Sequence, residues 1–562
     1  MYHQKPLKLD FAEHQSPSFT RTDDLNVTNS MYLTQSQHHI RANSIQEPTL
    51  RGRFVAGNAF FNYDALGSLR EGLAAVELLS GSYLGLAVNA VVAGFATIFV
   101  QYVFQQLLVA DFAAHHEGQI NAAKYLLQWP GAFAVFMGLI SDCAPINGSR
   151  RKPYIIIGWI LSCFMFAAVV IVHYSTESDA TIRAYLLLIF SMLAVFGIQL
   201  AYIVSLAMLV ELAQREHLYQ RGQLQGLYMV LYFGASTGAH IMSSFLVAPT
   251  DDGMGMTTEL DMSEAAVILA GASLFPVPFL LFFLRDERVD MHRVTISRRV
   301  SELWQLLQWK VVYKILFFLC GTVFFSAAFD PNVVQAIMLW SNVTPSKSVW
   351  WYTVRTGGKF VGVLMWKFFL INYSWRRLAF VGLLASVIAN TILAVPTIYD
   401  GVRDEWYMYI CSAVADVPLG WLEMFVLVAP TEIADVGREG AVIGLVNSYL
   451  VLITIATYTL WESVSDLAGM DVNIEDIMMD SRSTRNKVMV TGAIYIALNL
   501  IGVGAAVFIP TQKLDAQQLR AFGGYNRMAR LVLVAAFVVL LGYDLVANIV
   551  KVAKNNDASV VG

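Results

Sequence analysis

Five charged residues lie inside or at the end of long apolar runs in the second half of the sequence. Arg355 and Lys359 are four residues apart and Asp416 and Glu423 are seven apart, so each pair shares roughly one face of a helix. Asp330 comes directly before a helix-breaking proline. A charge inside a membrane helix is costly and usually faces a cavity or a partner. These five residues are therefore predicted to bind a polar solute, although a purely structural ion pair explains the same residues.

The depth of two of these charges supports the grouping. Lys359 and Asp416 each lie about twelve residues, or ~18 Å, from the outer ends of their predicted helices. That distance places both near the middle of a bilayer, where opposite charges can neutralise each other. We therefore expect Lys359 and Asp416 to lie close together.

A second set of charges lies in the stretch from Gly138 to Tyr154. Asp142 ends one apolar run, and after a Pro/Gly turn the cations Arg150, Arg151 and Lys152 open the next. Such residues belong in a tight loop at a membrane face, and three cations in a short loop favour the cytoplasmic face. Gly138, Asp142, Arg150 and Arg151 are predicted to form a charge latch that holds this face closed. The cations also serve as ordinary topological anchors, and the two roles are compatible.

The composition indicates a polytopic helical membrane protein. Of 562 residues, 56% are hydrophobic and only 14% are charged, whereas soluble chains carry about 25% charged residues. The net charge of −4 gives no basic surplus for nucleic acid. The four cysteines and ten histidines show no spacing typical of a metal site. The sequence therefore predicts no metal and no cofactor.

Thirteen apolar runs are long enough to be membrane helices. They cover residues 82–109, 121–141, 154–174, 183–210, 222–248, 264–284, 311–339, 347–371, 377–397, 405–429, 438–461, 487–509 and 529–550. With a cytoplasmic N-terminus, the cytoplasmic loops hold about twenty Lys and Arg and the other loops about six. This asymmetry supports the first twelve spans. The thirteenth run is expected to span, and the alternatives are a helix at the interface or one packed against the bundle.

The predicted helices fall into two similar halves. Gly222 to Gly226 and Gly440 to Gly444 each open a helix with G-x-x-x-G-L, and each follows a Glu-x-Ala element. From the N-terminus, the predicted organisation is a disordered cytoplasmic tail (1–81), a six-helix half (82–284), a cytoplasmic linker (285–310), a second six-helix half (311–509) and an extension (510–562). This all-α arrangement is typical of major facilitator proteins.

The loop also carries a family resemblance. Its pattern, Ser-Asp-x-x-Pro-Ile-x-Gly-x-Arg-Arg-x-Pro-Tyr, resembles that of the folate–biopterin transporters within the major facilitator superfamily. The resemblance covers the first half, and the second half is similar only in its helix pattern. It implies a plasma-membrane secondary active transporter, not an enzyme, that moves a folate, biopterin or related solute such as S-adenosylmethionine by alternating access with proton coupling.

Other interpretations remain open at this stage. A non-transporting receptor or scaffold with the same fold explains the helices equally well, but it has little need for charges at cavity depth. An intramembrane enzyme is disfavoured, because neither H-E-x-x-H nor G-x-S-x-G occurs. His240 is either a proton carrier or a packing residue. Trp350 and Trp351 are expected to anchor a helix at the membrane interface.

Overall fold

The computed structural model describes residues 67–70, 72–113, 126–175, 180–249, 256–287, 295–326, 331–467, 472 and 474–553. The chain divides into two units, Met1–Leu66 and Gly67–Gly562, and all of the described residues belong to the second unit. Most of the predicted tail therefore lies outside the described residues. Asp330, one of the five predicted solute-binding residues, also lies outside them.

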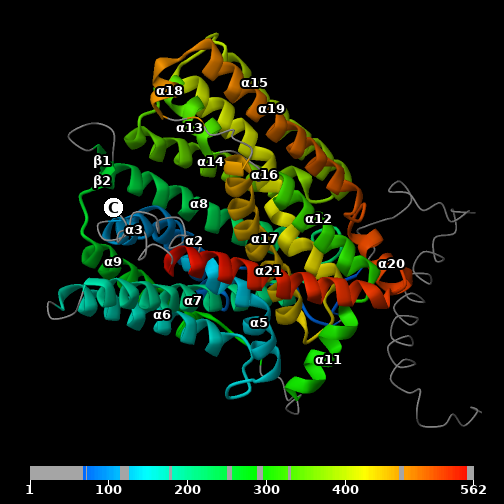
Figure 1. The fold of residues 1–562 in the computed structure, drawn as a ribbon. Helices are drawn as coiled ribbons and strands as arrows, with labels where there is room; N and C mark the ends of the chain where they lie inside the picture. Colours follow the sequence, from blue (N-terminus) through cyan, green and yellow to red (C-terminus); the bar gives the residue numbers. More distant parts are fainter. Residues whose placement is uncertain are drawn as a thin grey trace, which may run out of the picture. The chain divides into compact units, whose positions relative to one another are not determined.

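Helices of the first half follow the predicted runs closely (Figure 1). They are α2 (Leu84–Phe99), which continues through η2 (Val100–Phe104) into α3 (Gln105–Ala113), η4 (Trp129–Phe133) with α5 (Ala134–Cys143), α6 (Lys152–Tyr174), α7 (Ala180–Ala213), α8 (Gln223–Leu246), α9 (Met262–Leu274) and α10 (Pro276–Phe283). A short antiparallel hairpin, β1 (Val247–Pro249) with β2 (Met256–Thr258), follows α8 and pairs Val247 with Thr258. This hairpin is an addition to the predicted all-α fold, which is otherwise confirmed.

The linker and second half contain the remaining helices. They are α11 (Ile296–Leu306), α12 (Lys310–Ser326), α13 (Pro331–Trp340), α14 (Pro345–Met365) with η5 (Trp366–Leu370), α15 (Trp375–Ile398), α16 (Glu405–Ile433), α17 (Glu439–Leu467), α18 (Ile474–Met479), α19 (Arg482–Gly504) with η6 (Ala505–Val507), α20 (Lys513–Phe522) and α21 (Arg527–Ala553). Helix α21 corresponds to the predicted thirteenth helix. It packs on α17, where the Tyr449 hydroxyl donates to the carbonyl of Leu533 over 2.6 Å.

The surface of the helices suits a lipid environment. Ten helices in the described part of the chain are long and apolar enough to cross a membrane. Large apolar side chains project from their surfaces, among them Phe282, which is 80% exposed, and Phe369, which is 72% exposed. A soluble protein rarely exposes so many, because water disfavours contiguous apolar surface. The chain is a multi-pass membrane protein.

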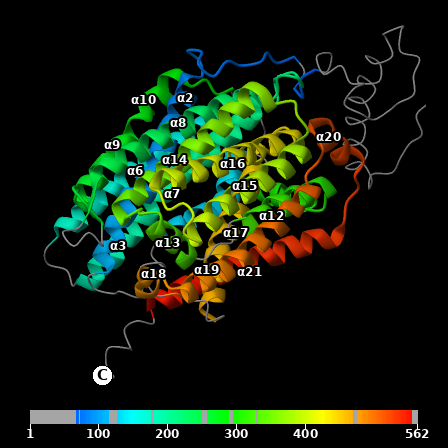
Figure 2. The same ribbon diagram turned by 90° about the horizontal axis from the view of Figure 1, so that it is seen from above.

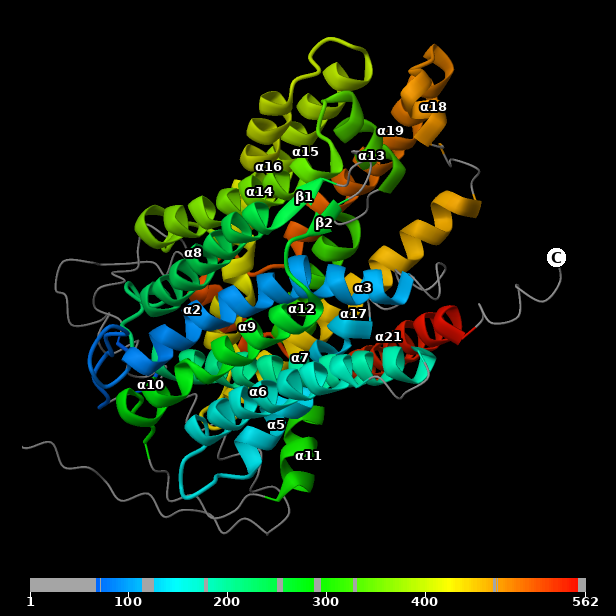
Figure 3. The same cartoon turned by 90° about the vertical axis from the view of Figure 1, so that its left-hand side faces the viewer.

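Two pairs of helices make the most extensive contacts between the halves. Helix α5 lies against α17, and α8 lies against α14. Figures 2 and 3 show α6, α9 and α10 of the first half on one side and α15 and α19 of the second half on the other. We call the end of the bundle that carries the Gly138–Tyr154 loop the loop face. At this face α5 and α17 approach so closely that a Cβ at Gly138 would overlap the carbonyl oxygen of Gly440.

Replacing Gly138 by alanine should therefore weaken the α5–α17 contact. The added methyl must displace backbone of α17 and not a flexible side chain, so we expect a cost of about 1–3 kcal/mol. The apparent unfolding temperature of the purified protein in detergent measures this cost. Gly238→Ala is the matched control, since its new Cβ meets nothing within 4 Å. Equal shifts for the two variants would contradict the close approach.

Candidate functional site

Asp142 ends α5 and binds the beginning of a helix in the other half. Its carboxylate accepts hydrogen bonds from the backbone amides of Gly440 (3.3 Å) and Ala441 (2.7 Å), in the first turn of α17. The first amides of a helix have no partner within it and favour a negative charge. Asp142 therefore caps a helix across the boundary between the halves.

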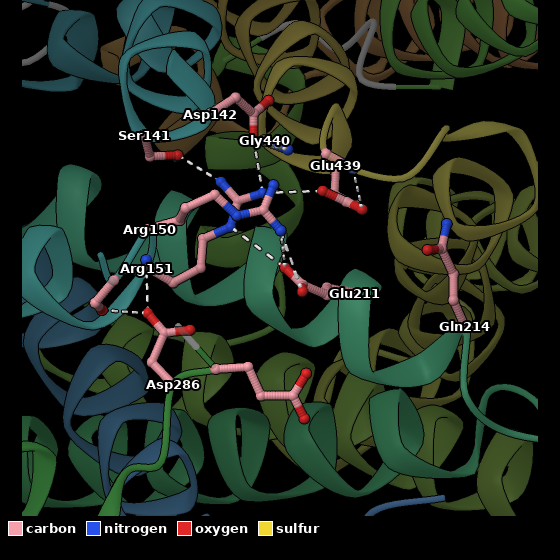
Figure 4. A network of polar contacts seen from close by, with 12 residues as sticks. Ser141, Asp142, Arg150, Arg151, Glu211, Gln214, Asp286, Glu439 and Gly440 are labelled. Atoms are coloured by element: carbon pink, nitrogen blue, oxygen red, sulfur yellow. Dashed lines mark hydrogen bonds and ion pairs between the residues drawn. The ribbon is translucent and has the colours of Figure 1, made fainter. Parts of the chain in front are cut away.

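The neighbouring cation completes this contact. Arg151, whose side chain is fully buried, places Nη2 2.6 Å from Oδ1 of Asp142 and 3.1 Å from Oε2 of Glu439 (Figure 4). Its Nη1 donates to Ser141 Oγ over 2.6 Å. Burial alone would lower the pKa of Arg151, but the surrounding carboxylates raise it above its usual range. Arg151 is thus a permanent positive charge between a carboxylate of each half.

The rest of the loop is fixed by further carboxylates. Arg150 lies 3.2 Å from Glu211 near the end of α7, and Arg151 Nε lies 3.8 Å from the same carboxylate. Asp286 accepts hydrogen bonds from the backbone amides of Arg151 (2.9 Å) and Lys152 (3.1 Å), at the beginning of α6. The predicted loop residues thus come together with three carboxylates that the prediction did not include, Glu211, Asp286 and Glu439. We call Asp142, Arg150, Arg151, Glu211 and Glu439 the Asp142 cluster.

A second ion pair lies at the matching place in the repeat. Arg221 and Glu432, both almost fully buried, are 2.9 Å apart, and Gln517 of α20 donates to Glu432 over 2.6 Å. Glu211 and Glu432 begin the two Glu-x-Ala elements recognised in the sequence. Each therefore receives an arginine at the loop face. The repeat was the signal that could have identified both glutamates as ion-pair partners.

In the interior, Arg355 of α14 binds Asp416 of α16. Nε lies 3.0 Å from Oδ2, and Nη2 donates to Oδ1 over 3.4 Å. The guanidinium carbon also lies 4.6 Å from the centre of the Trp351 ring, and the Trp351 indole donates to Ser412 Oγ over 2.8 Å. The expectation that Trp351 is an interfacial anchor was therefore wrong. Its ring is buried and packs against the guanidinium of Arg355, so it does not face the membrane interface.

The second interior pair joins Lys359 to Glu423, with 3.4 Å between Nζ and Oε1. We expected Lys359 to lie beside Asp416. The structure instead pairs Asp416 with Arg355 and Lys359 with Glu423. The reason is the register of α14 against α16, which distance from the helix ends does not determine. We call Arg355–Asp416 and Lys359–Glu423 the interior pairs.

The interior pairs remain accessible although residues of both halves surround them. The side chains of Arg355, Lys359 and Glu423 are 35%, 30% and 38% exposed, whereas Asp416 is only 4% exposed. An aromatic residue of the first half lies nearby: Tyr102 packs against Tyr352 in a tilted arrangement, with 5.0 Å between ring centres. Three of the four charged side chains are therefore accessible to solvent.

His240 has a different environment from the interior pairs. Its ring is fully buried against Tyr102, with 4.3 Å between ring centres, and neither nitrogen has a hydrogen-bond partner among the described residues. This arrangement favours the packing role over the proton-carrying one. The described residues also contain no group of three or more His, Cys, Asp or Glu side chains that could hold a metal ion.

Comparison with known proteins identifies the fold. A family model described as PUCC protein matches residues 118–329, which include the Gly138–Tyr154 loop. A crystal structure of a D-xylose–proton symporter is 14% identical, covers 76% of this chain and 97% of its own, and has a TM-score of 0.51. A proton:xylose symporter of the major facilitator superfamily bound to 6-bromo-6-deoxy-D-glucose is 11% identical, with 76% and 94% coverage and a TM-score of 0.52. No curated protein sequence matches the chain. Identities this low establish the fold alone.

One loop-face carboxylate has an unusual charge state. Glu216, between α7 and α8, accepts hydrogen bonds from the amides of Gly222 (2.8 Å) and Leu224 (2.9 Å). Burial nevertheless raises the pKa of Glu216 from 4.5 to about 7. The folded protein then binds more protons than the unfolded chain between these values. The free energy of unfolding from this group must fall as the pH rises from about 4.5 to 7.

Glu216→Gln should remove this decline. We expect the variant to gain about 1–3 kcal/mol relative to the parent between pH 5 and pH 7, since each pKa unit is worth about 1.4 kcal/mol. Unfolding temperatures measured at several pH values test the difference. Lys513 interferes little, because burial lowers its pKa only to about 8. Glu287→Gln is the control, since that side chain is 44% exposed, and a parallel change there would contradict the assignment.

Proposed function

We propose that this chain, which has the major facilitator fold, is a secondary active transporter that moves a small polar solute by alternating access. The loop face is the cytoplasmic face in this proposal, as the positive charges of its loops favour. The N-terminus then lies in the cytoplasm, and the membrane is the plasma membrane. The single observation that carries the proposal is the accessibility of the interior pairs.

The interior pairs are suited to exchanging partners with a charged solute. Arg355 binds a carboxylate through two nitrogens, and Asp416 and Glu423 can accept hydrogen bonds from amino groups. Cations and anions already face each other, so a zwitterion can pair its anion with the cation of one pair and its cation with the carboxylate of the other. The two displaced side chains carry opposite charges, so the site stays neutral. A receptor or scaffold needs no such accessible pairs, and this difference favours transport.

The resemblance of the loop to the folate–biopterin transporters suggests the class of solute. A pterin presents an aminopyrimidine edge to carboxylates, and a folate adds a glutamate tail for Arg355 or Lys359. Tyr102 and Trp351 offer aromatic rings near the pairs. S-adenosylmethionine, another charged solute, satisfies the same groups. The symporters with similar structures are xylose symporters, but a neutral sugar has no need for two ion pairs.

Proton coupling, if these pairs carry it, belongs to their carboxylates. Protonation of Asp416 or Glu423 would release the cation opposite and link proton movement to solute binding. The Asp142 cluster is proposed to act as the gate: solute can leave on the loop face only after Asp142 releases the first turn of α17 and Arg151 loses one of its carboxylates.

Uptake by cells that lack an endogenous system tests the proposal. Labelled folates, pterins and S-adenosylmethionine are supplied at two pH values, and accumulation of at least one is expected. Arg355→Ala and Asp416→Ala should each lower uptake by on the order of 100-fold, because each removes a charged group that is proposed to hydrogen-bond the solute. Lys347→Ala is the matched control, since Lys347 pairs with Glu405 between the same helices at an exposed position.

The amount of protein in the membrane separates the two roles of the interior pairs. If the variants lose uptake and protein to the same extent, the pairs are structural. If no solute moves in either direction with the parent protein, the proposed solute class is wrong. Faster uptake at the more acidic external pH is expected for proton coupling, and its absence would exclude coupling in that direction.

A further inference from the structure

A short segment before α2 reaches into the Asp142 cluster. The guanidinium of Arg70 places Nη1 3.1 Å from Glu211 and contacts Glu439 through Nη2, and its Nε donates to Gln214 over 3.0 Å. Glu211 belongs to α7 in the first half and Glu439 to α17 in the second. One side chain outside both bundles therefore joins the halves.

The backbone of the segment is also held. The amides of Leu69 and Arg70 donate to the carbonyl of Gln214 at 3.0 and 3.3 Å. The carbonyl of Gly67 accepts from Nη2 of Arg221 at 3.4 Å, and Arg221 is paired with Glu432 of the second half. The segment thus contacts both ion clusters of the loop face.

Arg70 balances the charge of the Asp142 cluster. The Asp142 cluster contains three carboxylates, of Asp142, Glu211 and Glu439, but only two cations of its own, Arg150 and Arg151. The side chains of Asp142 and Glu439 are fully buried and that of Glu211 is 12% exposed. Two positive charges against three negative ones leave one carboxylate uncompensated, which is costly in a buried site. Arg70, itself 9% exposed, supplies the third positive charge.

We propose that residues 67–70 are a strap that locks the loop face in its closed state. Arg70 holds α7 and α17 together, so the strap must leave before α5 and α17 separate. Release exposes an uncompensated carboxylate, and rebinding neutralises it. The region before α2 thereby sets how readily this face opens. The strap regulates the alternating access proposed above, but its closing role is measurable without any solute.

Cys143 provides a native reporter of opening. It is 5% exposed and packs with Leu139, Leu303 and, across the boundary of the halves, Ala441 of α17. Cys163, Cys320 and Cys411 are replaced by alanine, so that a maleimide can react only at Cys143. The rate of this reaction in the purified, solute-free protein reports the separation of α5 from α17.

Arg70→Ala should raise the labelling rate by on the order of 10-fold, because it leaves a buried carboxylate without its cation. Arg298→Ala is the matched control, since that arginine is 67% exposed on α11 and pairs with Glu302 in the next turn. The double variant Arg70→Ala/Glu439→Gln removes one charge of each sign. It should return labelling close to the parent rate.

These variants also guard against simple misfolding. A misfolded protein would label rapidly in the double variant as well, whereas rescue by Glu439→Gln requires charge balance in a folded cluster. Parent-like labelling of Arg70→Ala, or failure of the double variant to restore protection, would overturn the proposal. Uptake is not part of this measurement, so an absence of transport would refute the proposed function and leave the strap standing.

Discussion

The structure depends on one buried cation held between the two halves. Arg151 lies between Asp142 of the first half and Glu439 of the second, and Asp142 in turn caps the first turn of α17. Breaking a fully buried pair is far more costly than breaking an exposed one, because each separated charge stays in a low-dielectric site. A contact of this kind does not loosen gradually. In the proposed transport cycle it makes the loop face a two-state element, closed with every charge paired or open with the charges in water.

Close backbone approach is the condition for that contact. A side chain on Gly138 would overlap the backbone of α17, and a Cβ on Gly440 would lie 2.7 Å from Arg151 Nη1 and 2.9 Å from Asp142 Oδ1. The two glycines therefore leave room for the carboxylate to reach the amides of α17. In this way the G-x-x-x-G repeat, which promotes helix packing in general, here also determines the electrostatics.

The sequence predicted the helices and loop charges well and the pairing of charges poorly. Apolar runs between charged loops determine where helices begin and end, so the major facilitator fold followed from composition and the positive-inside pattern. Partners across helices depend on register and rotation, which the length of a run does not encode. Lys359 was therefore assigned to Asp416, and Trp351 to the interface. Arg70 was missed because a polar segment before the first helix has no periodicity to indicate where it docks.

The two sets of charges differ in the way that the proposed alternating access requires. The Asp142 cluster is almost fully buried and, with Arg70, neutral, so salt does little to weaken it. Three of the four interior-pair side chains are about one-third exposed, so their attraction is screened and a solute can compete for them at modest cost. Hydration of the separated charges then does not offset the cost of opening the loop face, so another contribution to the free energy is needed. In the proposal, binding of solute at the interior pairs is one such contribution. The pairs lie on α14 and α16, and α14 packs on α8 of the other half, so a change at the pairs can shift one half against the other. Release of the strap is the other, since it removes one of the charges that keep the cluster neutral.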